Sequence, residues 1–73
     1  MIDTADTALA IQELQAWIGR DPDSRYVREI RQFGAKWRVG LQAGADELTS
    51  SEDVELRGAI RNALMIAALA GHS

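Results

Sequence analysis

Residues 22–43 read Pro-Asp-Ser-Arg-Tyr-Val-Arg-Glu-Ile-Arg-Gln-Phe-Gly-Ala-Lys-Trp-Arg-Val-Gly-Leu-Gln-Ala, and the expected architecture depends on this segment. The pair Asp21-Pro22 is typical of a helix N-cap followed by proline at the first helical position. Behind it, the residues of one face recur at helical spacing, within an arc of about 120°. They are Tyr26, Val27, Ile30, Phe33, Gly34, Trp37 and Leu41. The pattern predicts one long helix over residues 22–43.

A shorter helix is expected before this segment, over residues 5–18. Gly19 is typical of the residue just beyond a helix end. Because only about two residues separate the two helices, they should fold back as an antiparallel hairpin. The apolar face of the shorter helix consists of Ala10, Ile11, Leu14, Trp17 and Ile18.

A third helix is expected over residues 51–70, with Gly71 just beyond its end. Residues 49–52, Thr-Ser-Ser-Glu, have the spacing of a capping box. The first apolar face of this helix consists of Leu56, Ile60, Ala63, Leu64 and Ala67. Residues 1–73 are therefore expected to form a single all-α domain, an antiparallel helical hairpin plus a third helix, that assembles as a helical homodimer.

The homodimer is inferred from a second apolar stripe on the third helix. A helix that is apolar nearly all round must be buried on more than one side, and a 73-residue chain offers little to cover it. The far end of the long helix likewise lacks partners within the chain. We assign self-association or partner binding to Val54, Gly58, Met65, Ile66, Leu69, Trp37 and Leu41. A monomeric bundle that buries both stripes is the alternative.

Positive charge is concentrated in residues 22–43. The segment has five cations against Asp23 and Glu29, a net charge of +3 in a chain whose net charge is −3. Such segregation is typical of a phosphate-binding helix or of a surface for an acidic protein. A solvated polar face edged by arginine stems is the more common explanation. The candidate residues for an acidic partner or for nucleic acid are Arg25, Arg28, Arg31, Lys36 and Arg38.

Catalytic chemistry is not indicated by any residue pattern. The one histidine, His72, lies at the end of the sequence, where residues are usually mobile and hold a base poorly in place. The chain has no cysteine. Its carboxylates fall mainly at expected helix ends, where the helix dipole accounts for them, and they lack the pattern of a calcium loop. We therefore expect no enzyme, no metal site, no cofactor and no small-molecule substrate.

The expected cellular location depends on the charge of the first residues and on the length of the longest apolar run. The first six residues contain no lysine or arginine, so a signal peptide is not expected. The longest apolar run, residues 63–70, is far shorter than the ~20 residues that span a bilayer. We expect a cytoplasmic protein without membrane contact, and seven arginines against one lysine favour a bacterial or phage source.

A non-enzymatic protein-interaction module is the function that best fits these features. It would be a dimeric regulator, adaptor or inhibitor that binds another protein, of the kind that phages and mobile elements encode. One alternative is a small DNA-binding transcriptional regulator that uses the arginines of residues 22–43, whose binding would weaken steeply with salt. The other is a structural subunit of a larger assembly, whose mass would keep growing with concentration.

Overall fold

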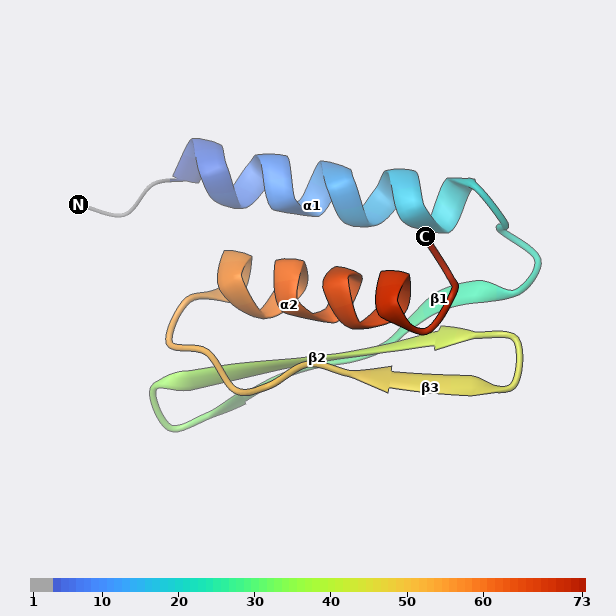
Figure 1. The fold of residues 1–73 in the computed structure, drawn as a ribbon. Helices are drawn as coiled ribbons and strands as arrows, with labels where there is room; N and C mark the ends of the chain where they lie inside the picture. Colours follow the sequence, from blue (N-terminus) through green and yellow to red (C-terminus); the bar gives the residue numbers. More distant parts are fainter. Residues whose placement is uncertain (1–3) are drawn as a thin grey trace.

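The computed structural model describes residues 4–73, which form two helices and one three-stranded antiparallel sheet (Figure 1). The elements follow the order α1 (Thr4–Gly19), β1 (Arg25–Phe33), β2 (Lys36–Ala43), β3 (Asp46–Thr49) and α2 (Leu56–Leu69). The fold is α+β. The expectation of an all-α three-helix chain is wrong, because residues 25–49 form a three-stranded sheet in place of the long second helix.

The long helix expected over residues 22–43 is replaced by the hairpin of β1 and β2. Asp21 and Pro22 begin a turn, in which the Asp21 carbonyl accepts hydrogen bonds from the backbone amides of Ser24 and Arg25. The helical spacing of the apolar residues has a specific cause in β1. A bulge between Val27 and Glu29 adds one residue, so Val27 and Ile30 share a face although they are three positions apart, as they would in a helix.

Both hairpin turns use the same dipeptide. Gly34-Ala35 joins β1 to β2, and Gly44-Ala45 joins β2 to β3. Each glycine has φ +60°, a conformation that a side chain makes costly and that glycine adopts readily. Glycine at the first central position is typical of the tight turns that join antiparallel strands. Gly34 is therefore a turn residue, and its expected place on the apolar face of a helix is wrong.

The helix α2 begins at Leu56, later than expected, because the preceding residues continue the sheet contacts. Ser50 pairs with Val39, whose amide donates to the Ser50 hydroxyl at 2.8 Å and whose carbonyl accepts from the Ser50 amide at 2.9 Å. Asp53 then forms an isolated antiparallel bridge with Trp37. The residues expected to cap a helix are thus occupied in extending the sheet.

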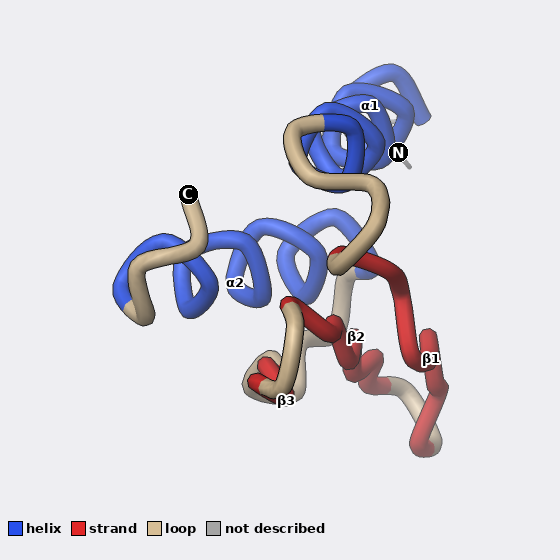
Figure 2. Tube along the Cα trace, turned by 90° about the vertical axis from the view of Figure 1, so that its right-hand side faces the viewer, coloured by secondary structure: helices blue, strands red, loops and turns tan. Residues whose placement is uncertain are grey.

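Both helices lie on one side of the sheet (Figures 1 and 2). The helix α2 packs over β2 and β3, whereas α1 packs chiefly on α2 and touches only β1 of the sheet. Val39, Leu41 and Ala43 alternate along β2 and point toward α2, as does Leu48 opposite Leu41. The buried core is Ala10, Leu14, Trp17, Val39, Leu41, Ala43, Leu48, Ala59, Ile60, Ala63 and Ala67. Within residues 4–73, no helix covers the other side of the sheet.

Candidate functional site

The exposed side of α2 carries large apolar side chains. Met65 is 54% exposed, Leu69 is 81% exposed, and Val54, in the segment before the helix, is 63% exposed. Met65 and Leu69 are four residues apart, so they lie one above the other on the same side of the helix. The core-facing side of α2 is formed by Ala59, Ile60, Ala63 and Ala67. We refer to Met65 and Leu69 as the α2 outer stripe.

The other residues assigned to this surface from the sequence are placed elsewhere. Leu41 is fully buried in β2, and Trp37 and Ile66 are partly buried against the core. Gly58 is not open to a partner, because a Cβ atom there would lie 2.5 Å from a carboxylate oxygen of Asp53. The expectation that Trp37 and Leu41 lack partners depended on a long helix, and it is wrong. The structure thus brings Met65 and Leu69 together and leaves Trp37 and Leu41 apart from them.

Strand geometry gathers four of the five candidate cations on the side of the sheet that faces away from the helices. Arg25 is the exception, because its guanidinium stacks on the Trp17 ring at 4.8 Å from the centroid and donates to the Trp17 carbonyl at 3.0 Å. We call the helix-free side the outer sheet face. Its cations are Arg28, Arg31, Lys36 and Arg38, and its aromatic residues are Tyr26 and Phe33.

Phe33 is at the centre of the cations near the β1–β2 turn. The guanidinium of Arg31 lies 5.2 Å from the centroid of its ring, and that of Arg38 lies 4.8 Å from it. Lys36 is directly opposite Phe33 on β2. Cation–π contact of this kind holds an exposed aromatic ring in place and favours arginine over lysine at the contact.

Most of the positive charge on the outer sheet face is compensated. Arg28 reaches Glu47 at 3.6 Å, and it crosses β2 at Gly40, where a side chain would lie 3.6 Å from its Nη1 atom. Arg38 pairs with Glu52 at 2.8 Å. Arg31 lies 3.9 Å from Glu29. Four cations and three carboxylates leave a small positive excess, so the electrostatic attraction of this face for a polyanion is local and weak.

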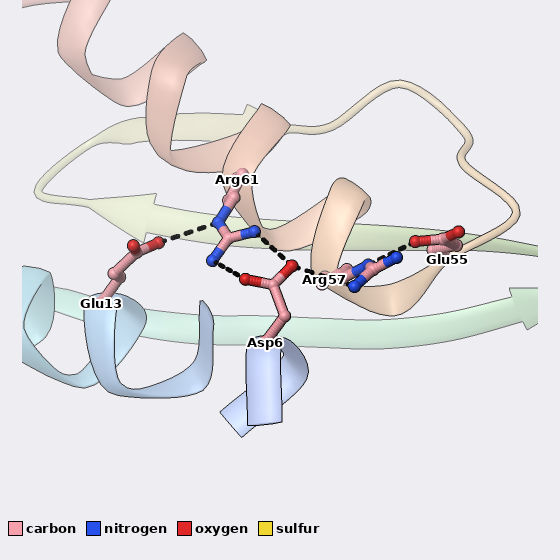
Figure 3. Close-up of polar contacts among 5 residues, drawn as sticks. All are labelled: Asp6, Glu13, Glu55, Arg57 and Arg61. Atoms are coloured by element: carbon pink, nitrogen blue, oxygen red, sulfur yellow. Dashed lines mark hydrogen bonds and ion pairs between the residues drawn. The ribbon is translucent and has the colours of Figure 1, made fainter. Parts of the chain in front are cut away.

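A polar network joins the two helices (Figure 3). The Asp6 carboxylate accepts two hydrogen bonds of 2.8 Å from the Nη atoms of Arg61 and one of 3.1 Å from Arg57. Arg61 also donates to Glu13 at 3.2 Å, and Arg57 pairs with Glu55. The bidentate geometry is the strongest that arginine and a carboxylate adopt.

The charges in this network stabilise each other's ionised forms. The hydrogen bonds from Arg61, aided by its charge and that of Arg57, lower the pKa of Asp6 below its usual value. The hydrogen bonds to Asp6 and Glu13 raise the pKa of Arg61. Each of the five charged groups drawn in Figure 3 is engaged in an ion pair. The network is a connection between α1 and α2, and the sequence patterns did not indicate it.

The end of the chain is held against the rest of the structure. The His72 carbonyl accepts a hydrogen bond from the Trp17 indole at 2.6 Å, and the His72 ring lies 2.7 Å from Asp46. The expectation of a free tail at His72 is therefore wrong. Among residues 4–73, no three histidine, cysteine or acidic side chains are placed to hold a metal ion together. The helices of that range are too short or too polar to cross a membrane.

Comparison of the chain with protein-family models, with curated proteins and with solved structures gave no match. The α2 outer stripe and the outer sheet face are the two candidate binding surfaces among the described residues.

Proposed function

We propose that this chain is a non-enzymatic protein-interaction module, a small regulator, adaptor or inhibitor, that binds a protein partner through the α2 outer stripe. The observation that carries the proposal is the exposure of Leu69 and Met65 on one side of one helix. Exposed apolar side chains that cluster in this way mark interaction sites.

The chemistry of the stripe suits an apolar partner. Burial of one such side chain contributes about 1.5–3 kcal/mol, and the flexible thioether of Met65 adapts to different neighbours. Asn62 and Arg61 lie beside the stripe on the same helix, partly exposed, so a polar rim accompanies the apolar centre, as in protein interfaces generally. A helix with such a stripe fits an apolar groove or a second apolar helix on the partner.

The test is a double substitution, Met65→Asp with Leu69→Asp, compared with a matched control on the exposed side of α1, Ala8→Asp with Gln12→Asp. Both pairs are one helical turn apart, exposed, and given two negative charges. Each tagged protein is used to recover partners from a host lysate, which are quantified by mass spectrometry, and circular dichroism checks the fold. The parent and the control should retain the same partners, and the α2 variant should lose them. A folded α2 variant that keeps the full set of partners would contradict the proposal.

A second candidate function, binding of single-stranded nucleic acid, is favoured by the outer sheet face. The strands gather Arg31, Lys36 and Arg38 around the exposed ring of Phe33, and bases stack on such rings while cations contact the phosphates. Anisotropy of a labelled oligonucleotide, titrated at low and high salt, tests it. Binding that weakens with salt and is lost in Arg31→Glu with Arg38→Glu would support it. Absence of salt-dependent binding by the parent would rule it out.

A further inference from the structure

The strand β1 is a long, exposed edge of the sheet. Within residues 4–73 it pairs only with β2, so the backbone along its other side has no partner strand. It has nine residues, whereas natural proteins usually keep edge strands short or covered. Of the eight exposed large apolar side chains in the described residues, three belong to β1: Tyr26 at 55%, Ile30 at 47% and Phe33 at 40%. This edge therefore resembles one half of an interface.

The sequence of β1 is complementary to itself when a second copy runs antiparallel to it. With Ile30 opposite the partner's Ile30, Glu29 lies opposite the partner's Arg31, and Arg31 lies opposite the partner's Glu29. Opposite charges in directly facing positions stabilise antiparallel pairs. The charges of Glu29 and Arg31 therefore favour a second copy of the same strand in this register.

The bulge extends the complementarity toward both ends of the strand. Because Arg28 is the extra residue, the next facing pairs are Val27 with Gln32 and Tyr26 with Phe33. Tyr26 and Phe33 both point to the outer sheet face, so the two rings meet on the same side of the joined sheet. Aromatic pairs are among the most stabilising cross-strand pairs. All three exposed apolar residues of β1 thereby gain a partner.

Neighbouring registers lack this match. Centring the pairing on Glu29 places two carboxylates opposite each other, and centring it on Arg31 places two guanidinium groups opposite each other. Both arrangements are destabilising. Registers offset by an odd number of residues bring side chains from opposite sides of the sheet into the same pair. Of these registers, the one centred on Ile30 places opposite charges in facing positions and keeps the side chains of each facing pair on the same side of the sheet.

We infer that a second copy of this chain binds antiparallel along β1, about a twofold axis at Ile30, and forms a continuous six-stranded sheet. The same surface is used by both copies, so the contact closes at two. The outer edges of the joined sheet are then the two β3 strands, which have four residues each and begin with Asp46 and Glu47. Short, charged edges of this kind resist further pairing. The helix α2 packs over β2 and β3 and does not contact β1 (Figure 2), so the inference is independent of the proposed function.

The test reverses the charges of Glu29 and Arg31, one at a time. Solution mass is measured by light scattering or sedimentation over a wide concentration range, with circular dichroism on each sample. The parent should reach twice 8.0 kDa. Glu29→Arg alone and Arg31→Glu alone each place like charges opposite each other, and each should self-associate roughly tenfold or more weakly. An equimolar mixture of these two single variants should form a heterodimer, because both facing pairs are then of opposite charge.

The heterodimer separates the interface from any effect within one chain, since neither monomer changes on mixing. A cysteine scan gives the register. The chain contains no cysteine, and directly facing positions are about 4.5–5.5 Å apart between Cα atoms, which suits a disulfide. Ile30→Cys should give a covalent dimer on mild oxidation, well ahead of Leu69→Cys.

Three results would overturn the inference. The first is a parent protein that stays a monomer at high concentration. The second is a mixture of the single variants that stays monomeric although both components are folded. The third is a dimer that survives the charge exchanges and is lost in Met65→Asp with Leu69→Asp, which would assign self-association to the α2 outer stripe. Retention of the dimer in that α2 variant, with loss of the captured protein, would support both proposals separately.

Discussion

The indole Nε1 of Trp17 donates a 2.6 Å hydrogen bond to the backbone carbonyl of His72, 55 residues further along the chain. Arg25 reinforces this contact from β1, since its guanidinium stacks on the Trp17 ring and donates to the Ser73 carbonyl at 3.2 Å. The end of α1, the start of β1 and the segment after α2 are therefore joined at one buried indole.

Removal of residues 72–73 should destabilise the domain by about 1–3 kcal/mol, because the buried indole donor of Trp17 loses its acceptor. Urea unfolding followed by fluorescence in a Trp37→Phe background, which leaves Trp17 as the only reporter, measures the change. Removal of Ser73 alone is the control and should cost much less. An unchanged unfolding midpoint after removal of both residues would show that water replaces the lost acceptor.

Truncation to alanine should destabilise the protein strongly at Leu41 and hardly at all at Leu69. Leu41→Ala should lower the free energy of unfolding by about 2–5 kcal/mol, because it opens a cavity in the core. Leu69→Ala should change it by no more than about 0.5 kcal/mol, since Leu69 is exposed. Chemical denaturation of both variants checks the pair. A large loss in Leu69→Ala at concentrations where the protein is monomeric would conflict with the exposure of that residue.

Gly34→Ala should destabilise the hairpin by about 1–2 kcal/mol, because alanine must adopt a positive φ in the turn. Gly19→Ala is the matched control. Gly19 has no positive φ, and nothing lies within 4 Å of the place its Cβ would take, so this substitution should be neutral or stabilising. Thermal unfolding of the two variants gives the comparison. Equal melting temperatures would argue against a positive φ at residue 34 in the turn.

The Asp6 network should make stability depend on acid pH. The pKa of Asp6 is lowered in the folded state, so its contribution is fully present above the unfolded-state pKa of about 4. It is lost as the pH falls through the folded-state pKa. Asp6→Asn should therefore be less stable than the parent at pH 7, and the difference should shrink at acid pH. Asp23→Asn, an exposed carboxylate outside the network, is the control, and urea unfolding at both pH values is the measurement.

The two helices could be predicted from the sequence because their apolar residues are spaced for one buried side, and Gly71 follows α2. Gly19, expected just beyond the first helix, is instead the last residue of α1 and has no positive φ. The hairpin could not be predicted, because the bulge at Arg28 gives Val27 and Ile30 a helical spacing. Two signals favoured strands. Val39, a β-branched residue, falls off the expected helical face. The dipeptide Gly-Ala stands at both turns, residues 34–35 and 44–45, although it also occurs in α2 at residues 58–59. The aromatic and β-branched residues of this segment are also those that strands favour.

The candidate surfaces, too, could be predicted from the sequence only in part. Met65 and Leu69 were assigned to an exposed stripe because their place depends only on the helix that contains them. The grouping of the cations on one face could not be predicted, because Arg31 and Arg38 share a face only when β1 and β2 pair. The contact between Asp6 and Arg61 joins residues 55 positions apart, and no local pattern indicates a partner at that distance.

The position of α1 has a consequence for how the domain is made. This helix packs chiefly on α2 and only slightly on β1, so the first of these five elements to be synthesised has its main docking surface on the last of them. Until α2 is complete, the side of α1 that bears Leu14 and Trp17 is covered only in part, by Arg25 of β1. The three strands and α2 can come together earlier, because their contacts are close in sequence. The helix α1 is therefore synthesised before the other elements, but it is the last of them to pack onto the domain.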